Sequence, residues 1–353
     1  MTERVNAVTI ESGEERRPQL HLLPIYETPN LCGIVLAGGD GERLRPLIHR
    51  LRGDSLPKQY VTFIGTRSLL EHTFHRAEKL IPSDRIFAVI NRNHLKFAEV
   101  QRQISRRPRV TLIVQPVNKE TGPGILLALM HVYKRFPDST VVVFPSDHFI
   151  LEEDLFMSHV YQAFRAVERD GSRLVILGMT PHDADSEYGY IVPGKEIEDP
   201  GLGSARKIEL FVEKPATEAA KIIIRSGALL NTLVIVARCK TLLDAVQCTM
   251  PGLHRSFQLI LRAIGTPEEQ PVVEQVYHEL RPMNFSRGVL EVLPAFKQRQ
   301  AFLVLPVRGV FWSDWGSECR LHETFKKLAC HEQLLAPLPE LRLRDASGGA
   351  EII

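Results

Sequence analysis

The sequence is poor in cysteine. Only five of its 353 residues are cysteines, their number is odd, and no two of them form a CxxC pair. This spacing argues against both a disulfide framework and a structural zinc site. Cysteine that is neither paired nor metal-bound behaves as a small apolar residue. We therefore expect buried free thiols at Cys32, Cys239, Cys248, Cys319 and Cys330.

Long apolar runs and an excess of charge of one sign are lacking as well. No apolar run approaches the roughly 18 residues of a membrane helix, and the N-terminal stretch MTERVNAVTIESGEERRPQ lacks the apolar centre of a signal peptide. The net charge of +2 provides no basic field for nucleic acid. We expect a cytoplasmic protein with neither membrane nor nucleic acid as a partner. The sequence neither predicts nor excludes a homo-oligomer.

What is present is the composition of a globular domain. Hydrophobic residues make up 44% and charged residues 24% of the chain, enough for a sizeable core. Both ends are polar or rich in proline, and we expect a mobile arm over residues 1–30 and a tail over 335–353. Residues 31–330 are expected to form the functional domain. No internal repeat interrupts this range.

Short apolar strands and amphipathic helices alternate through the first half of this range. Strands are predicted at 32–37, 85–91, 109–116, 139–148 and 173–179. Helices are predicted at 68–81, 94–105, 124–136 and 155–170. This order predicts an α/β fold with a doubly wound, mostly parallel, Rossmann-like sheet. Ligands of such sheets bind beyond the carboxyl ends of the strands.

The alternation changes after residue 178. The segments 189–194 and 207–215 read as longer mixed or antiparallel strands, and 218–227 reads as a helix. We expect these pieces to build a smaller mixed β lobe over about 180–300. The apolar segment 302–317 then returns to the first lobe.

A cluster of glycines follows the first strand, in VLAGGDGERLRPL (35–47). It is not a Walker loop, because no Lys-Ser or Lys-Thr pair follows the glycines. A dinucleotide fingerprint is also excluded, because Leu44 stands where a small residue is needed. We expect Pro46 to limit any helix after Gly41 to about one turn.

What remains is an open glycine loop suited to phosphate. Bare backbone amides can surround an anion, and the guanidinium of Arg43 can donate to phosphate oxygens. We expect the carboxylates of Asp40 and Glu42 to point into solvent. A plain tight turn is the alternative. About fifteen residues after Arg43, the segment LPKQY adds Lys58, which would otherwise be read as a solvated surface residue.

Together, LAGGDGERLRPL and LPKQY resemble the signature of the sugar-phosphate nucleotidyltransferases. The similarity is strongest to the mannose-1-phosphate guanylyltransferase branch, with its pattern AGG-x-G-T-R-L-x-P-L followed by PKQ. Five further blocks resemble that branch in the same order, and the resemblance spans about 31–322. They are QPVNKETGPGILLAL (115–129), FPSDH (144–148), EYGYI (187–191), FVEKP (211–215) and VFWSDWGS (310–317).

The resemblance implies a GT-A-like nucleotidyltransferase that uses Mg²⁺ and transfers GMP from GTP to mannose 1-phosphate, releasing pyrophosphate and giving GDP-mannose. It implies catalytic roles for Arg43 and Lys58 and metal ligation by Asp147 and Asp314. The nucleotide-binding residues it implies are Leu36, Ala37, Gly38, Gly39, Gly41, Arg43, Gln115, Gly122 and Asp147. The sugar-phosphate-binding residues it implies are Gly189, Glu213, Lys214 and Asn231.

Structural alternatives exist for several of these residues. Asp147 would also suit a helix N-cap, and Asp314 a turn ahead of a glycine. Glu213 and Lys214 would also suit a solvated strand end. We expect His148 to be structural, because magnesium prefers oxygen ligands.

The chain departs from the branch at four places. Residues 230–235 keep only the asparagine of W-N-S-G-M-F, and Ser286 replaces the aspartate of S-I-D-Y-A-V-M-E. Lys119-Glu120 replaces R-N, and Glu42 replaces a small or hydroxyl residue. Another hexose or heptose 1-phosphate, another nucleotide, or a weakened regulatory paralogue that binds nucleotide sugar therefore stays open. The chain is too short for the isomerase domain of long members, and we expect a single activity.

Overall fold

The computed structural model describes residues 28–197, 202, 204–295 and 301–329, and the backbone of 342–344 and 350–352. Most of the expected arm and tail therefore lies outside the described residues, and the domain boundaries stay predictions. Within the tail, two short strands, β12 (Arg342–Arg344) and β13 (Ala350–Ile352), pair with each other.

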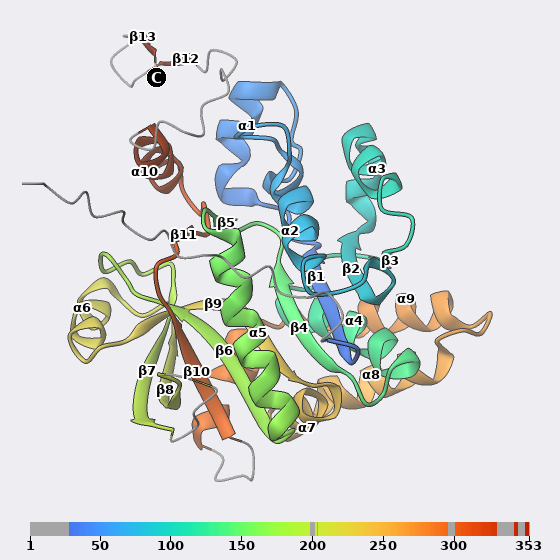
Figure 1. Ribbon diagram of the computed structural model, residues 1–353. Coiled ribbons are helices and arrows are strands. Elements are labelled where there is room, and N and C mark those ends of the chain that lie inside the picture. The colour runs from blue at the N-terminus through green and yellow to red at the C-terminus, as the bar shows by residue number, and fades with distance from the viewer. Residues whose placement is uncertain are drawn as a thin grey trace, which may run out of the picture.

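The described chain folds around a nine-stranded mixed sheet in the order β3-β2-β1-β4-β9-β6-β10-β8-β7 (Figure 1). Strands β3, β2, β1 and β4 are parallel, and β10 is parallel to β6. The strands are β1 (Leu31–Ala37), β2 (Ile86–Asn91), β3 (Thr111–Gln115), β4 (Thr140–Pro145), β6 (Arg173–Met179), β7 (Gly189–Glu196), β8 (Arg206–Glu213), β9 (Leu229–Arg238) and β10 (Ala301–Val307). Each strand predicted from the sequence is present.

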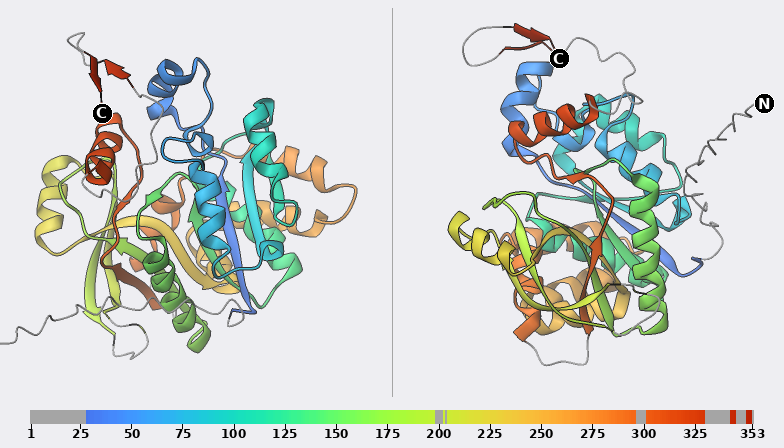
Figure 2. Two further views of the ribbon diagram at one scale, coloured as in Figure 1. Left: turned by 45° about the horizontal axis from the view of Figure 1, so that its top comes forward. Right: turned by 60° about the vertical axis from the view of Figure 1, so that its left-hand side comes forward.

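Helices cover both faces of the sheet, as Figures 1 and 2 show. Alternate residues of β1 enter two separate cores: Val35 packs with α5 on one face, and Ile34 packs with α4, α7 and α8 on the other. Burial on both faces explains why the strands are almost continuously apolar. The helices are α1 (Arg45–Arg52), α2 (Leu69–Ala77), α3 (Ala98–Ser105), α4 (Thr121–Arg135), α5 (Glu153–Arg169), α6 (Thr217–Arg225), α7 (Cys239–Thr249), α8 (Pro251–Ala263), α9 (Glu269–Glu279) and α10 (Glu318–Ala329).

Strand β9 was not predicted, although it lies in the middle of the sheet. It runs antiparallel to both of its neighbours, β4 and β6. Its apolar run is visible in the sequence, but its partners are about 50 to 100 residues away along the chain. Nothing local specifies that insertion. The expected mixed β lobe is formed by β7 and β8, which pair antiparallel and extend the same sheet beyond β10.

Two local predictions were wrong. Pro46 does not limit the helix: a 3-10 turn at Glu42–Leu44 leads directly into α1, which has Pro46 in its first turn. A proline is tolerated there because the missing N–H would have no helical partner. Cysteine burial also holds only in part, because Cys32 and Cys239 are buried, whereas Cys248 is half-buried and Cys319 is exposed.

The topology brings distant segments to one edge of the sheet. Leu36 of β1 pairs in register with Pro145 of β4, so the glycine loop lies beside residues 146–148. The return strand β10 is followed by β11 (Trp312–Ser313), which pairs with β5 (Phe149–Ile150). Asp314 thereby arrives next to Asp147.

Candidate active site

The glycine loop is closely packed and needs its glycines at two positions. A Cβ on Gly38 would lie 2.4 Å from Nε2 of Gln115. Gly41 has φ of 61°, in the left-handed region that glycine enters without strain. A Cβ there would also lie 3.0 Å from the backbone nitrogen of Lys58. The glycine loop and the LPKQY segment are therefore built against each other.

Asp40 corrects one expectation about this loop. Its carboxylate does not point into solvent, because Oδ1 lies 3.2 Å from Nε2 of His94 and Oδ2 accepts from Asn118 at 2.8 Å. Burial lowers the pKa of His94, although Asp40 opposes this effect. Asp40 thus fastens the loop to two neighbouring segments. Glu42, in contrast, has the exposed side chain expected of it.

Lys58 is buried, with 7% of its side chain exposed, so the reading of a solvated surface lysine is wrong. Its Nζ donates to the backbone oxygen of Asp314 at 2.5 Å and lies 3.1 Å from Oδ2 of Asp147. Burial opposes ionisation of Asp147, but the charges of Lys58 and His148 outweigh it and hold the pKa of that carboxyl below its usual value. Lys58 therefore links the carboxylate of Asp147 to the backbone of Asp314, the two segments that carry the candidate metal ligands.

Arg43 forms an ion pair with Glu187, and its Nη2 lies 3.5 Å from Oδ2 of Asp314. Its side chain keeps 46% of its surface exposed, toward the pocket that it lines. The guanidinium is thus held in place by carboxylates while remaining open to a ligand.

The structure decides between the alternatives for the two aspartates. Helix α5 has Glu152 at its N-cap, so Asp147 is not a helix cap. Asp314 does accept from the backbone nitrogen of Gly316 at 3.1 Å, so the expected turn is real. Asp314 also lines the pocket, so the turn does not exclude a metal-binding role. His148 accepts from the indole of Trp312 at 3.3 Å, in keeping with a structural role.

Most of the predicted groups line one pocket of about 270 Å³, although Lys58 is not among its lining residues. Loop residues, both aspartates and three predicted sugar-phosphate residues line it: Leu36, Gly39, Gly41, Arg43, Asp147, Asp314, Gly189, Glu213 and Asn231. No group of three or more His, Cys, Asp or Glu side chains in the described chain could hold a metal by itself. Two carboxylates facing one pocket do suit Mg²⁺, which takes few protein oxygens when substrate phosphates complete its shell.

On the sugar side, strand pairing places Gly189 opposite Glu213. A Cβ on Gly189 would lie 2.5 Å from Oε2 of Glu213, so glycine leaves room for that carboxylate. Burial raises the pKa of Glu213 above its usual value. Asn231 donates to the hydroxyl of Ser286 at 3.2 Å, at the position where the branch has aspartate. Lys214 is exposed and lines an adjoining pocket of about 470 Å³.

A further pocket of about 220 Å³ adjoins the glycine loop. Gly38, Gly39 and Gln115 line it, and Oε1 of the buried Gln115 has no hydrogen-bond partner. Two predicted nucleotide residues lie outside both pockets. The carbonyl of Ala37 accepts from Gln59 and Tyr60, and Gly122 donates to the backbone oxygen of Met283 at 2.9 Å.

Comparison with known proteins decides the family. The model of the family described as "Nucleotidyl transferase" matches residues 32–330. The chain belongs to this family. Mannose-1-phosphate guanylyltransferase of Klebsiella pneumoniae is 26% identical over 301 residues, covering 84% of this chain and 60% of the relative. The enzyme of the same name from Salmonella montevideo is 31% identical over 298 residues, covering 83% and 60%. The chain thus spans about 60% of the length of these curated relatives.

Solved structures with a similar fold support this assignment. One described as mannose-1-phosphate geranyltransferase, from Thermus thermophilus, superposes with a TM-score of 0.70 at 26% identity, covering 84% of this chain and 79% of its own. One described as mannose-6-phosphate isomerase, from Helicobacter pylori, has a TM-score of 0.62 at 18% identity and covers 80% and 99%. The second likeness bears on the fold alone.

Four residues around this nucleotidyl transferase site were not predicted. Gln59 bonds the carbonyls of Ala37 and Gly39 at 2.9 and 2.7 Å, and it follows Lys58 directly in the quoted motif. Glu187 and Tyr188 lie within the EYGYI block, so position in a block was the available signal. Arg320 lies outside every block, and nothing local in the sequence marks it.

Among the described helices, none is both long and apolar enough to span a bilayer.

Proposed function

We propose that this protein transfers GMP from GTP to a sugar 1-phosphate, with mannose 1-phosphate as the favoured acceptor, to give GDP-mannose in nucleotide sugar biosynthesis. The observation that carries the proposal is the convergence of Arg43, Asp147 and Asp314 with Glu213 in one pocket. Phosphate-binding, metal-binding and hydroxyl-binding chemistry then meet where the two substrates would join.

The reaction needs positioning and charge neutralisation rather than a covalent intermediate. A phosphate oxygen of the sugar 1-phosphate attacks the α-phosphorus of the nucleotide. A new phosphorus–oxygen bond forms as the bond to the β-phosphate oxygen breaks, and pyrophosphate leaves with the electron pair. No proton transfer is required when all these phosphate groups are ionised.

Two cations of the chain are assigned to the phosphates. Arg43 offers a fork of donors at the glycine loop, and Gly39 and Gly41 of that loop line the same pocket. Lys58 stands between Asp147 and the backbone of Asp314 and adds positive charge where the α-phosphate would lie. Preorganised charges of this kind lower the barrier because they need no rearrangement during the reaction.

Asp147 and Asp314 would hold a magnesium ion, which supplies charge neutralisation between the two phosphate groups. The open face of Asp147 supports this assignment, because 38% of its side chain is exposed to the pocket. The ion pair with Lys58 keeps Asp147 ionised.

On the acceptor side, the Glu213 carboxylate is placed to accept hydrogen bonds from sugar hydroxyls, and Asn231 can offer its amide. Lys214 at the adjoining pocket is assigned to the sugar's phosphate. On the nucleotide side, the unpartnered Oε1 of Gln115 is an acceptor suited to an N–H of the base. The identity of the sugar and of the base is assigned from the relatives.

The test is a matrix of pyrophosphate release. GTP, ATP, UTP, CTP and dTTP are each paired with mannose, glucose and heptose 1-phosphates, with and without magnesium. We expect a magnesium-dependent signal that is greatest with GTP and mannose 1-phosphate. A signal with another pair would change the substrates but keep the reaction. Absence of pyrophosphate from every pair would refute the transferase and favour the regulatory paralogue.

A further inference from the structure

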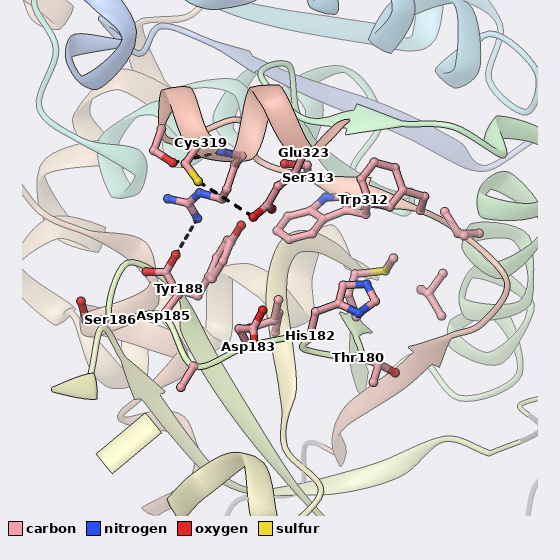
Figure 3. A pocket seen from close by; sticks show the side chains of 18 of the residues that line it. Thr180, His182, Asp183, Asp185, Ser186, Tyr188, Trp312, Ser313, Cys319 and Glu323 are labelled. Carbon is pink, nitrogen blue, oxygen red and sulfur yellow. Dashed lines mark hydrogen bonds and ion pairs between the residues drawn. The ribbon is translucent and has the colours of Figure 1, made fainter. Parts of the chain in front are cut away.

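A larger pocket of about 560 Å³ lies directly behind the candidate active site. Tyr188 and Trp312 line both pockets, so the two are separated by a single layer of side chains. Figure 3 shows the larger pocket, with Asp185, Tyr188 and Trp312 among the residues that line it. Two quoted blocks, EYGYI and VFWSDWGS, supply part of this lining, but no role was assigned to the pocket from the sequence.

Arg320 reaches from this second pocket to the active site. It comes from the first turn of α10, and 11% of its side chain is exposed. Its Nη1 lies 3.1 Å from Oδ1 of Asp314 and 3.5 Å from Oδ2 of Asp185. The guanidinium carbon lies 4.5 Å from the ring centroid of Tyr188, a cation–π contact. One side chain therefore contacts a candidate metal ligand and the segment that leads into β7.

The two oxygens of Asp314 have different surroundings. Oδ1 accepts from the hydroxyl of Tyr188 at 2.9 Å and from the backbone of Gly316 at 3.1 Å, and it faces Arg320 as well. Oδ2 has Arg43 as its charged neighbour, at the longer distance of 3.5 Å. Oδ1 thus has two hydrogen-bond donors, and Nη1 of Arg320 lies within ion-pair distance of it without the alignment of a hydrogen bond. Oδ2 is left for a ligand in the active-site pocket.

We propose that Arg320 is a positioning residue that holds Oδ1 of Asp314 and thereby turns Oδ2 toward the magnesium ion of the transfer reaction. This inference rests on the proposed function. Partners of metal ligands commonly fix ligand orientation in this way. The guanidinium also repels a nearby divalent cation. Its loss should disorder the carboxylate and slow the reaction without weakening attraction for the metal.

The experiment compares Arg320→Gln and Arg320→Lys with Arg308→Gln, whose residue lines the same larger pocket but does not contact Asp314. We expect kcat of Arg320→Gln to fall about 10- to 100-fold, the range seen for partners of metal ligands. The magnesium concentration for half-maximal rate should fall, because the guanidinium that repels the cation is gone. Arg320→Lys should recover part of kcat, and Arg308→Gln should behave as wild type. Equal losses in Arg320→Gln and Arg308→Gln would overturn the inference.

A second readout does not depend on turnover. The chain has two tryptophans, Trp312 and Trp315, and both lie within two residues of Asp314. Quenching of their fluorescence by Mn²⁺, in the presence of GTP, reports binding at this carboxylate. We expect a dissociation constant at least threefold lower in Arg320→Gln than in wild type. Identical titrations in the two proteins would overturn the inference, even if the pyrophosphate matrix had already refuted the transferase. If Arg320→Gln does not fold, Arg320→Met, which also removes the positive charge, carries both measurements with changes of the same sign.

Discussion

At the scale of single residues, the site is organised by one buried lysine. Lys58 contacts the carboxylate of Asp147 and the backbone of Asp314, which are 167 positions apart in the numbering. A buried ammonium is stable only when it is paired. Here its partners are one proposed metal carboxylate, that of Asp147, and the backbone carbonyl of Asp314. The same contact that removes the cost of burying Lys58 also sets the spacing of the two acidic segments.

Asp147→Asn tests the metal assignment. The amide keeps the size of the side chain but loses the charge and one acceptor oxygen, so turnover should fall at least ~100-fold, as when one charge-stabilising group is lost. Steady-state pyrophosphate release at saturating magnesium measures this. Asp84→Asn, an exposed aspartate in a 3-10 turn, is the control for a simple change of charge. Wild-type turnover in Asp147→Asn would exclude it as a metal ligand.

At the scale of elements, the antiparallel pair β7–β8 builds the acceptor side. Its register sets Gly189 opposite Glu213 at the inner end, where β9 also pairs with β7. The outer end of the same strand carries Gly194, whose added Cβ would make only ordinary contacts of 3.4 Å or more. One strand therefore offers a glycine with a proposed functional role and a matched control.

Gly189→Ala should move the Glu213 carboxylate, because the new Cβ would stand 2.5 Å from Oε2. The far end of a glutamate can rotate away, so the fold should persist. The Michaelis constant for the sugar 1-phosphate should rise about tenfold, equivalent to about 1.4 kcal/mol, while that for GTP stays constant. Gly194→Ala should change neither constant. Equal effects of the two substitutions on both substrates would contradict this role of Gly189.

At the scale of the whole molecule, burial of the Glu213 carboxyl in the candidate pocket should lower the free energy of unfolding when that group is ionised. Glu213 is held in a position where burial raises its pKa above the value of 4.5 that an unperturbed glutamate has. The folded protein then binds a proton more tightly than the unfolded chain. The contribution of protonated Glu213 is fully present below 4.5 and is lost as the pH rises through the raised pKa.

Glu213→Gln resembles the protonated form at every pH. It should therefore raise the free energy of unfolding relative to wild type, by more at pH 8 than at pH 5, while lowering activity. Chemical denaturation at the two pH values measures the difference. Glu209→Gln replaces an exposed glutamate of the same strand and should show no such trend. If the increase in the free energy of unfolding does not grow with pH, burial of the ionised Glu213 carboxylate does not destabilise the fold.

The alternation of strands and helices, the mostly parallel sheet with helices on both faces, and most of the candidate residues that line the pocket were predictable from the sequence. These features are local: apolar periodicity determines the elements, and short contiguous blocks carry Arg43, Lys58 and Asp147. The burial of Lys58 was not predictable, because its partners come from remote segments. The fixed position of Asp40 was missed for the same reason, since His94 and Asn118 lie 54 and 78 residues away.

The sequence alone thus determined the family resemblance and the chemical types of the site residues, because both are carried by short contiguous motifs. Only the tertiary structure decided that β9 enters antiparallel between β4 and β6, that Tyr188 and Arg320 support Asp314, and that Gly122 lies outside the pockets. Those outcomes depend on contacts between segments far apart along the chain. No local propensity encodes such contacts, because they form only when the whole sheet closes around its two cores.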